Sequence, residues 1–217
     1  MHLLVCAATA FEIKPTLETI NRDQELRSKT SFVITGIGLA AATYHITKML
    51  HTNRPSLVLQ AGICGSLSND LQLGEVLVIR SECIGDLGVT QERSFHSIFD
   101  LKLQDPDEYP WKKGKLYNNN SLLASCGLNV VDATTVNEIT TTGARVEYYK
   151  EKLQTDVESM EGAALHYSCL LEKIPFLQVR AVSNYATERD KSKWQMSKAV
   201  ANLNIKVLEL ISKILQP

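Results

Sequence analysis

The sequence contains no CxxC pair and no cysteine or histidine cluster at the spacing of metal ligands. Its five cysteines are dispersed along the chain, which favours free thiols in a cytoplasmic protein over a disulfide framework. No apolar run reaches the roughly 18 residues of a membrane-spanning helix, and the first residues lack the basic region of a signal peptide. We therefore expect no metal site and no membrane partner.

An excess of charge of one sign is absent as well. The 23 Lys and Arg residues nearly balance the 24 Asp and Glu residues, and the formal net charge is −1. Without a net positive field, the chain is not expected to bind nucleic acid. The 217 residues are 44% hydrophobic, which allows a sizeable core, and they contain no linker or internal repeat. We expect one domain over residues 1–217.

Short apolar runs alternate with segments of helical periodicity. The segments expected to form strands are 2–8, 31–35, 56–60, 74–80, 128–132 and 174–182. Those expected to form helices are 39–50, 160–171 and 198–215. This alternation indicates an α/β fold around a largely parallel sheet. Residues 85–120 break the pattern, and we expect a long excursion with some local structure there.

Open parallel sheets bind ligands beyond the carboxyl ends of their strands, so the residues that follow each strand are the candidates for a site. Residues 36–41 read GIGLAA and match the GxGxxA dinucleotide fingerprint. The motif follows the second strand, however, and it lacks the carboxylate expected roughly 20 residues later. It is therefore either a tight turn or a turn whose N–H groups meet a ligand or an attacking water. The glycine-rich segment 62–66 lacks the Lys-Ser/Thr of a P-loop and leaves similar alternatives.

Two carboxylates are candidates for chemistry. Glu12 directly follows the first strand, where it could stabilise a helix N-terminus or act as a general base that faces the crevice. Met160 and Glu161 place a thioether beside a carboxylate at the start of a helix. A sugar needs both surfaces, because a carboxylate accepts hydrogen bonds from vicinal hydroxyls and a thioether packs on ring carbons. Helix capping is the alternative for Glu161.

Together these segments resemble the nucleoside phosphorylase/nucleosidase superfamily over most of the chain. The matching motifs are the first strand with Glu12, GIG at 36–38, AGICGSL at 61–67, LGEVLV at 73–78, VESMEGAA at 157–164 and PFLQVRAVSN at 175–184. Within the superfamily, the ending SNYATERDKSKW resembles futalosine hydrolases, the nucleosidases of menaquinone biosynthesis, more than methylthioadenosine/S-adenosylhomocysteine nucleosidases. The resemblance implies a three-layer domain with a central mixed, largely parallel twisted sheet flanked by helices. It also implies a nucleoside substrate, no cofactor, and a homo-oligomer of two or more chains.

The resemblance also implies roles for individual residues. Glu12 would position and activate the attacking water. Met160 would lie against the ribose, and Glu161 would bind its 2′- and 3′-hydroxyls. Arg180 and Ser183 would support the loop on the purine side.

Four further residues are implied to line the pocket. Ile37, Cys64 and Gly65 would lie near the sugar and the base. Val136 falls in the stretch that stacks on the base, by position only, because the aromatic residue usual in the adenosine-type enzymes is missing. For the far, benzoate-bearing end of the substrate, the candidate carboxylate partners are Arg93, Lys112, Lys113 and the cluster 189–193.

Asn184 is the main departure, because adenine-cleaving nucleosidases have an aspartic acid at this place. A protonated carboxyl accepts a hydrogen bond from N6 of adenine and gives its proton to N7. A 6-oxopurine presents O6 beside N7, and an amide fits this pattern because its NH₂ donates to O6 and its carbonyl accepts from N7–H. Asn184 therefore indicates hypoxanthine as the leaving base, with water supplying the proton. The expected reaction is hydrolysis of the N-glycosidic bond of futalosine.

Other functions stay open. A methylthioadenosine/S-adenosylhomocysteine nucleosidase would share the motifs around the sugar. A purine nucleoside phosphorylase would share the fold and the asparagine, but the segments 36–39 and 62–66 contain no basic residue to hold phosphate. A catalytically silent nucleoside-binding protein would not need Glu12.

Overall fold

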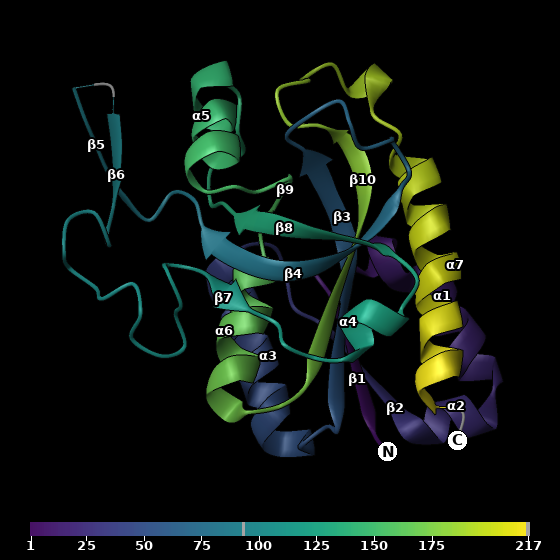
Figure 1. Ribbon diagram of the computed structural model, residues 1–217. Helices are drawn as coiled ribbons and strands as arrows, with labels where there is room; N and C mark the ends of the chain where they lie inside the picture. Colours follow the sequence, from purple (N-terminus) through teal and green to yellow (C-terminus); the bar gives the residue numbers. More distant parts are fainter. Residues whose placement is uncertain (93, 216–217) are drawn as a thin grey trace.

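In the computed structural model, which describes residues 1–92 and 94–215, strands and helices alternate along most of the chain (Figure 1). The strands are β1 (Leu3–Ala7), β2 (Thr30–Ile34), β3 (Leu57–Ser66), β4 (Val76–Ile84), β5 (Gly88–Gln91), β6 (Ser94–Ser97), β7 (Leu116–Tyr117), β8 (Asn129–Thr135), β9 (Val157–Ser159) and β10 (Phe176–Tyr185). The helices are α1 (Ala10–Arg22), α2 (Gln24–Lys29), α3 (Leu39–Asn53), α4 (Leu122–Ser125), α5 (Gly143–Glu147), α6 (Gly162–Glu172) and α7 (Met196–Leu215). The chain also contains a π-helical turn, η1 (Tyr148–Lys152), and a 3₁₀ turn, η2 (Lys191–Lys193).

The main sheet is mixed and largely parallel, as predicted. Its strand order is β10-β4-β8-β9-β3-β1-β2, and an additional pairing joins β10 to β3. This pairing closes β3, β10, β4, β8 and β9 into a ring, from which β1 and β2 extend. The antiparallel pairs are β4 with β10, β3 with β9, and β4 with β7.

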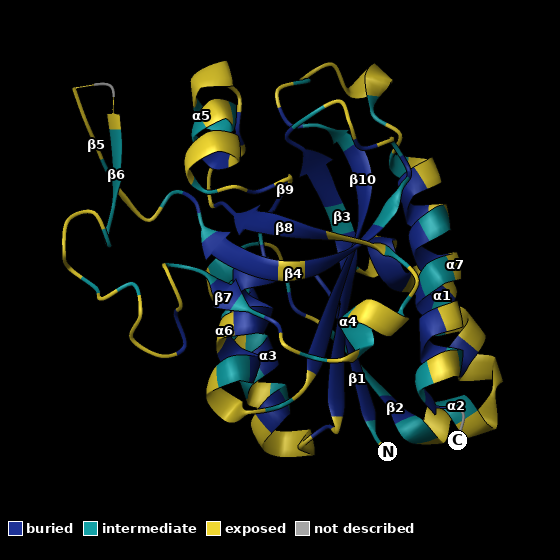
Figure 2. Ribbon diagram, in the orientation of Figure 1, coloured by how far each residue is buried: buried dark blue, intermediate teal, exposed yellow. Residues whose placement is uncertain are grey.

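Helices cover the sheet on both sides. Alternate residues of β1 enter two different cores: Leu3 and Val5 pack in the cluster with α1 and α7, and Leu4 and Cys6 pack in the cluster with α3 and α6. Burial on both faces explains why the predicted strand is continuously apolar. Figure 2 shows the buried strands between the two helical layers, so the predicted three-layer arrangement is confirmed.

Several predicted boundaries are wrong for physical reasons. Residues 62–66 form no turn but complete β3, because they pair with β10 along their length and with β9 at Gly65 and Ser66. The helix predicted from Met160 begins at Gly162, because the short strand β9 comes first. Helix α1 begins directly after β1, so the helix N-terminus considered for Glu12 is present, and the helix continues through Pro15.

The excursion at 85–120 has local structure, as expected. Strands β5 and β6 form a hairpin that projects away from the main sheet (Figure 1). Further along, Trp111 is buried and packs edge-on against Phe99. Strand β7 then returns the chain to the edge of β4. Arg93, a candidate for the far end of the substrate, lies outside the described residues.

Candidate active site

One cavity, of about 390 Å³, brings together nine of the ten residues that were expected to act on or bind the sugar and the purine. It lies beyond the carboxyl ends of β1, β3 and β10, where ligands of such sheets are expected. The predicted residues that line it are Glu12, Ile37, Cys64, Gly65, Val136, Met160, Glu161, Ser183 and Asn184. Because these residues are far apart in the sequence, it is the topology of the sheet that brings them together. Arg180, the tenth residue, is not among the lining residues.

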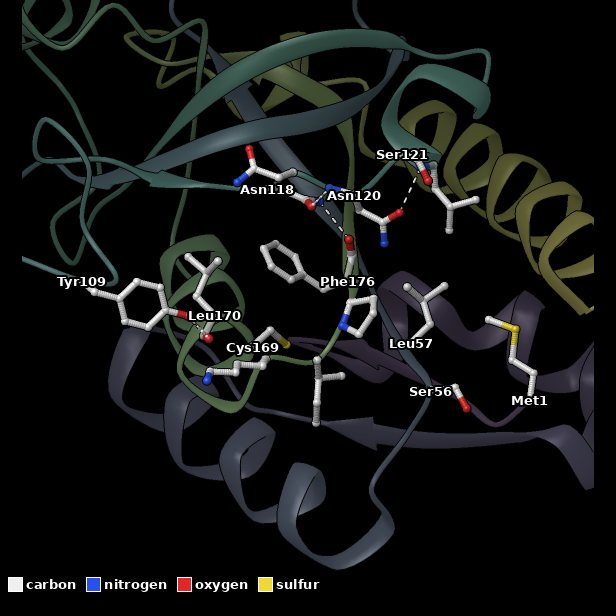
Figure 3. A pocket seen from close by; sticks show the side chains of 15 residues that line it. Met1, Ser56, Leu57, Tyr109, Asn118, Asn120, Ser121, Cys169, Leu170 and Phe176 are labelled. Carbon is white, nitrogen blue, oxygen red and sulfur yellow. Dashed lines mark hydrogen bonds between the residues drawn. The ribbon is translucent and has the colours of Figure 1, made fainter. Parts of the chain in front are cut away.

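A second cavity, of about 630 Å³, lies at the opposite end of the sheet (Figure 3). Ser56, just before β3, and Phe176, at the start of β10, lie on its wall together with Tyr109 and Asn118. The described residues that line it include no aspartate or glutamate. The first cavity has three carboxylates on its wall, Glu12, Glu158 and Glu161, and is therefore the candidate active site.

Glu12 is held at the N-terminus of α1 by a capping box. Its Oε2 accepts hydrogen bonds from the backbone N–H of Thr9 at 2.9 Å and the Thr9 hydroxyl at 2.7 Å, and the Glu12 N–H donates back to that hydroxyl. The other oxygen, Oε1, accepts from the backbone N–H of Ile63 in β3 at 3.1 Å. The expected helix-capping role is thus observed, and the same carboxylate is fixed against the sheet at the cavity wall; its action as a general base stays a prediction.

Glu161 is fixed by two donors of different kinds. The backbone N–H of Gly38, in the GIG turn, donates to its Oε1 at 3.0 Å. Its Oε2 lies 3.6 Å from Nη1 of Arg180, and both side chains are buried. One N–H group of the GIG turn, that of Gly38, therefore meets a protein carboxylate, and the turn orients Glu161 at the cavity wall.

Arg180 lies behind this carboxylate and does not line the cavity, and its expected support of the purine-side loop stays a prediction. Its Nη2 donates to Gln60 Oε1 at 3.0 Å, and its guanidinium occupies space next to Gly62. A Cβ on Gly62 would lie 2.3 Å from Nη1 of Arg180 and 3.1 Å from Oε1 of Glu12. This glycine is needed because two functional side chains pass over it, a reason that the sequence motif alone does not reveal.

Asn184 lies next to a bulge in β10, which falls between Val182 and Asn184. Its Oδ1 accepts a hydrogen bond from the Ser183 hydroxyl at 2.7 Å, and its Nδ2 donates to the carbonyl of Tyr185 at 3.0 Å. Ser183 therefore holds the amide, and it also lies 3.1 Å from the carbonyl oxygen of Cys64. One Nδ2 hydrogen and one Oδ1 lone pair of the amide remain for a ligand.

Glu158 is a cavity residue that sequence reasoning did not assign. It lies on β9, is buried, and lines the cavity with Asn184 and Glu161. Its Oε2 has no hydrogen-bond partner. Burial raises its pKa, and the neighbouring Thr140 and Arg189 partly oppose this shift. The only signal in the sequence is that two carboxylates stand three residues apart in VESME.

The charged run that follows β10 closes one side of the cavity. Arg189 and Trp194 both line it, and the guanidinium of Arg189 lies 5.6 Å from the centre of the Trp194 ring. The indole N–H of Trp194 donates to the carbonyl of Glu188 at 2.8 Å, which fixes the ring. The other described candidates for the far end of the substrate, which are Lys112, Lys113 and residues 190–193, are not among the lining residues.

The cavity offers acid–base groups but no nucleophilic thiol. Burial raises the pKa of Cys64 to about 12, so its thiol stays protonated at neutral pH. Within residues 1–92 and 94–215, no group of three or more His, Cys, Asp or Glu side chains is placed to hold a metal ion. In the same part of the chain, no helix has the length and apolar character needed to cross a membrane.

Comparison with known proteins places this geometry in a family. The profile of the phosphorylase superfamily matches residues 25–213. The chain belongs to this superfamily. Its curated relatives include futalosine hydrolase of Thermus thermophilus, 26% identical over 85% of this chain and 83% of that protein. They also include 5′-methylthioadenosine/S-adenosylhomocysteine nucleosidase of Baumannia cicadellinicola, 25% identical over 86% of this chain and 82% of that protein. The chain is thus an enzyme of the phosphorylase superfamily with hydrolases among its relatives.

Solved structures of the superfamily share the whole fold. Futalosine hydrolase of Helicobacter pylori superposes with a TM-score of 0.79 at 18% identity, covering 99% of both chains. The nucleosidase of Neisseria meningitidis in complex with methylthio-immucillin-A superposes equally well, with a TM-score of 0.79 at 20% identity over 98% of this chain and 99% of that one. The predicted fold is therefore confirmed, and the fold does not distinguish the two activities.

Proposed function

We propose that this phosphorylase-superfamily enzyme hydrolyses the N-glycosidic bond of futalosine and releases hypoxanthine and dehypoxanthine futalosine. The observation that carries the proposal is the placement of Glu12, Glu161 and Asn184 around one cavity. These side chains provide a base for water, an anchor for the sugar hydroxyls and an amide for the purine. The reaction needs no cofactor.

At the sugar end, two fixed carboxylates divide the work. Glu161 accepts hydrogen bonds from the 2′- and 3′-hydroxyls, and Met160 packs on the ribose ring. As the base departs, the ribose gains oxocarbenium character and C1′ is attacked by water. Glu12 takes the proton of this water as a general base, a contribution of about 10²–10⁴ in rate. Donors from Thr9 and Ile63 keep its carboxylate aimed, since they come from two rigid elements.

At the base end, Asn184 favours a 6-oxopurine. Its free Nδ2 hydrogen suits O6, whereas the 6-amino group of adenine would place two donors face to face. The interaction strengthens as negative charge develops on the leaving purine, so it favours the transition state over the ground state. Two of the curated relatives, from Thermus thermophilus and Streptomyces coelicolor, are futalosine hydrolases at 26% and 27% identity.

The environment of the cavity further supports a hydrolase over a phosphorylase. Arg189 is the one lysine or arginine among the lining residues that the structure describes, and it neighbours Glu158 rather than Glu12. Phosphate at the sugar would meet Glu12 and Glu161, whose carboxylates repel an anion. The guanidinium of Arg180 is engaged by Glu161 behind the wall.

A homo-oligomer with a cytoplasmic location is part of the proposal. Phe11 and Ile37 line the cavity and yet expose 58% and 64% of their surface. Large apolar side chains exposed at the rim of a site favour cover by another chain, and a second copy is the simplest partner. Size measured by light scattering at assay concentration tests this point.

The test of the reaction is incubation with futalosine in phosphate-free buffer, with hypoxanthine followed by chromatography. Release of hypoxanthine without phosphate is expected. Release only when phosphate is added would identify a phosphorylase instead. A Glu12→Gln variant that binds futalosine without turnover would show that the wild-type protein is more than a nucleoside-binding protein.

A further inference from the structure

Three carboxylates line the cavity, and their surroundings differ. Glu12 accepts hydrogen bonds from three N–H and O–H donors. Glu161 has a backbone N–H donor and the guanidinium of Arg180. Both environments suit an ionised carboxylate. Glu158 has a buried Oε2 with no partner, so its surroundings suit the neutral acid.

Glu158 lies in one row with Asn184 across three strands. Gly65 of β3 pairs with Glu158 of β9 on one side and with Asn184 of β10 on the other. Residues paired in this way project their side chains to the same face of a sheet. A Cβ on Gly65 would lie 3.4 Å from Cγ of Glu158 and 3.5 Å from Nδ2 of Asn184. Because Gly65 has no side chain, its backbone leaves a flat surface between the side chains of Glu158 and Asn184, which suits a planar purine ring. This surface is called the Gly65 floor below.

The charged and titratable groups near Glu158 act in both directions. Burial is the largest influence and raises the pKa of Glu158, while hydrogen bonding by Thr140 and the charge of Arg189 lower it. Cys64 and Tyr149 are also close, but burial raises the pKa of Cys64 to about 12 and holds the pKa of Tyr149 well above its usual value, so both are neutral at the pH of an assay. Arg189 is thus the one charged neighbour that opposes protonation of Glu158 among these groups.

The departing purine needs a proton that Asn184 cannot give. An amide N–H stays on nitrogen, and Oδ1 of Asn184 already accepts from the Ser183 hydroxyl. The Nδ2 hydrogen left for the ligand suits O6. A purine that accepts this hydrogen bond and lies over the Gly65 floor would have its neighbouring N7 between Asn184 and Glu158. An acid at this point would spare the enzyme the release of a purine anion.

The geometry points to Glu158 as the general acid that protonates N7 of the leaving purine, an inference that rests on the proposed N-glycosidic hydrolysis. In this step the bond between C1′ and N9 breaks and its electron pair moves into the purine. The proton on Glu158 passes to N7, and Glu158 becomes a carboxylate. Water adds its oxygen to C1′ and gives its proton to Glu12. Exchange of one proton with solvent at each carboxyl then restores the starting state.

This assignment follows a general pattern in which carboxyls of one site are driven to different protonation states by their environments. It replaces the water that the sequence suggested as the source of the proton. It also gives the three carboxylates of the cavity distinct tasks: Glu12 acts on water, Glu161 on the sugar, and Glu158 on the base.

The test compares two leaving groups in wild type and Glu158→Gln. Futalosine needs a proton on its base, whereas 4-nitrophenyl β-riboside releases a phenolate that needs none. In the variant, kcat for futalosine should fall by about 10²–10⁴-fold, and kcat for the nitrophenyl riboside should stay within about threefold. Glu18→Gln, on the exposed face of α1, serves as the matched control and should change neither rate.

A second measurement works without any variant. For wild type, kcat/KM with futalosine should fall at alkaline pH as Glu158 loses its proton, and kcat/KM with the nitrophenyl riboside should not show this limb. An unchanged futalosine rate in Glu158→Gln, an equal loss with both substrates, or the same alkaline limb for both would overturn the inference. If wild type hydrolyses neither compound, the proposed function fails and takes the inference with it.

Discussion

Nη1 of Arg180 lies 3.6 Å from Oε2 of Glu161, in an ion pair that is almost completely buried beneath the cavity. The guanidinium is further held by Gln60, whose own Nε2 donates to the carbonyl of Glu161 at 3.3 Å. The carboxylate that is proposed to bind the sugar is thus positioned from below by a network that never meets solvent. Removal of one partner of such a pair is costly because the other charge stays buried and unpaired.

Replacement of Arg180 by methionine should therefore lower both stability and affinity. We expect a loss of about 3–5 kcal/mol in the free energy of unfolding, measured by urea denaturation. Any folded protein should show a raised KM, because Glu161 loses its orientation. Arg180→Lys keeps the charge without the planar fork and should lie between the two. A methionine variant with wild-type KM would contradict the positioning role of Arg180.

Gly62 should not tolerate even a methyl group. In Gly62→Ala the new Cβ would lie 2.3 Å from Nη1 of Arg180, so the guanidinium must move away from Glu161. We expect a loss of about 1–3 kcal/mol in stability together with a fall in kcat/KM. Gly143→Ala is the matched control, because a Cβ there meets no atom within 4 Å and should leave activity unchanged.

Asn184→Asp should change the preferred base. A protonated aspartate can accept from N6 of adenine and donate to N7, whereas the amide suits O6. The ratio of kcat/KM for inosine to that for adenosine should therefore fall by about tenfold or more, which corresponds to roughly 1.4 kcal/mol of discrimination. Steady-state assays on the two nucleosides measure this ratio. If it is unchanged in the variant, Asn184 does not read the base.

Glu82 should make stability depend on pH near neutrality. Burial raises its pKa to about 7, against a usual value of 4.5, with Gln178 and Thr135 as its hydrogen-bond donors. The folded state therefore holds the proton more tightly than the unfolded chain. This stabilisation is complete below about pH 4.5 and is lost as pH rises through about 7, a change of roughly 3 kcal/mol.

The difference in stability between wild type and Glu82→Gln isolates this effect. Burial lowers the pKa of His166 to about 4, so His166 contributes the opposite slope below pH 6.5, but it is present in both proteins. Gln178 can accommodate the new amide by rotating its side chain, because its Oε1 has no partner. Urea denaturation from pH 5 to pH 8 should show wild type losing stability relative to the variant. A constant difference would rule out a neutral Glu82.

Features with a local signature could be predicted from the sequence. The continuous apolar runs of β1, β3 and β10 indicate burial on both faces, and polar residues after these strands mark the edge where the cavity lies. The order and spacing of the motifs then predict that Glu12, Glu161 and Asn184 share one cavity, as they do.

Features that depend on contacts between distant segments could not be predicted. The path of Arg180 over Gly62 depends on the register between β3 and β10, which no motif contains. Glu158 faces the cavity only because the three residues of β9 pair with β3, and so short a strand has no readable alternation. Arg189 and Trp194 come from a charged run whose composition is that of an exposed loop, yet they form part of the wall.

The central claim is that the cavity selects a 6-oxopurine nucleoside, and the specificity constant for two substrates tests it most directly. Wild-type kcat/KM should be measured for futalosine and for 5′-methylthioadenosine in the same phosphate-free buffer, with the released base identified by chromatography. The amide of Asn184 predicts that futalosine is preferred by at least about tenfold, with hypoxanthine as its product. Preference for 5′-methylthioadenosine, with release of adenine, would contradict the account.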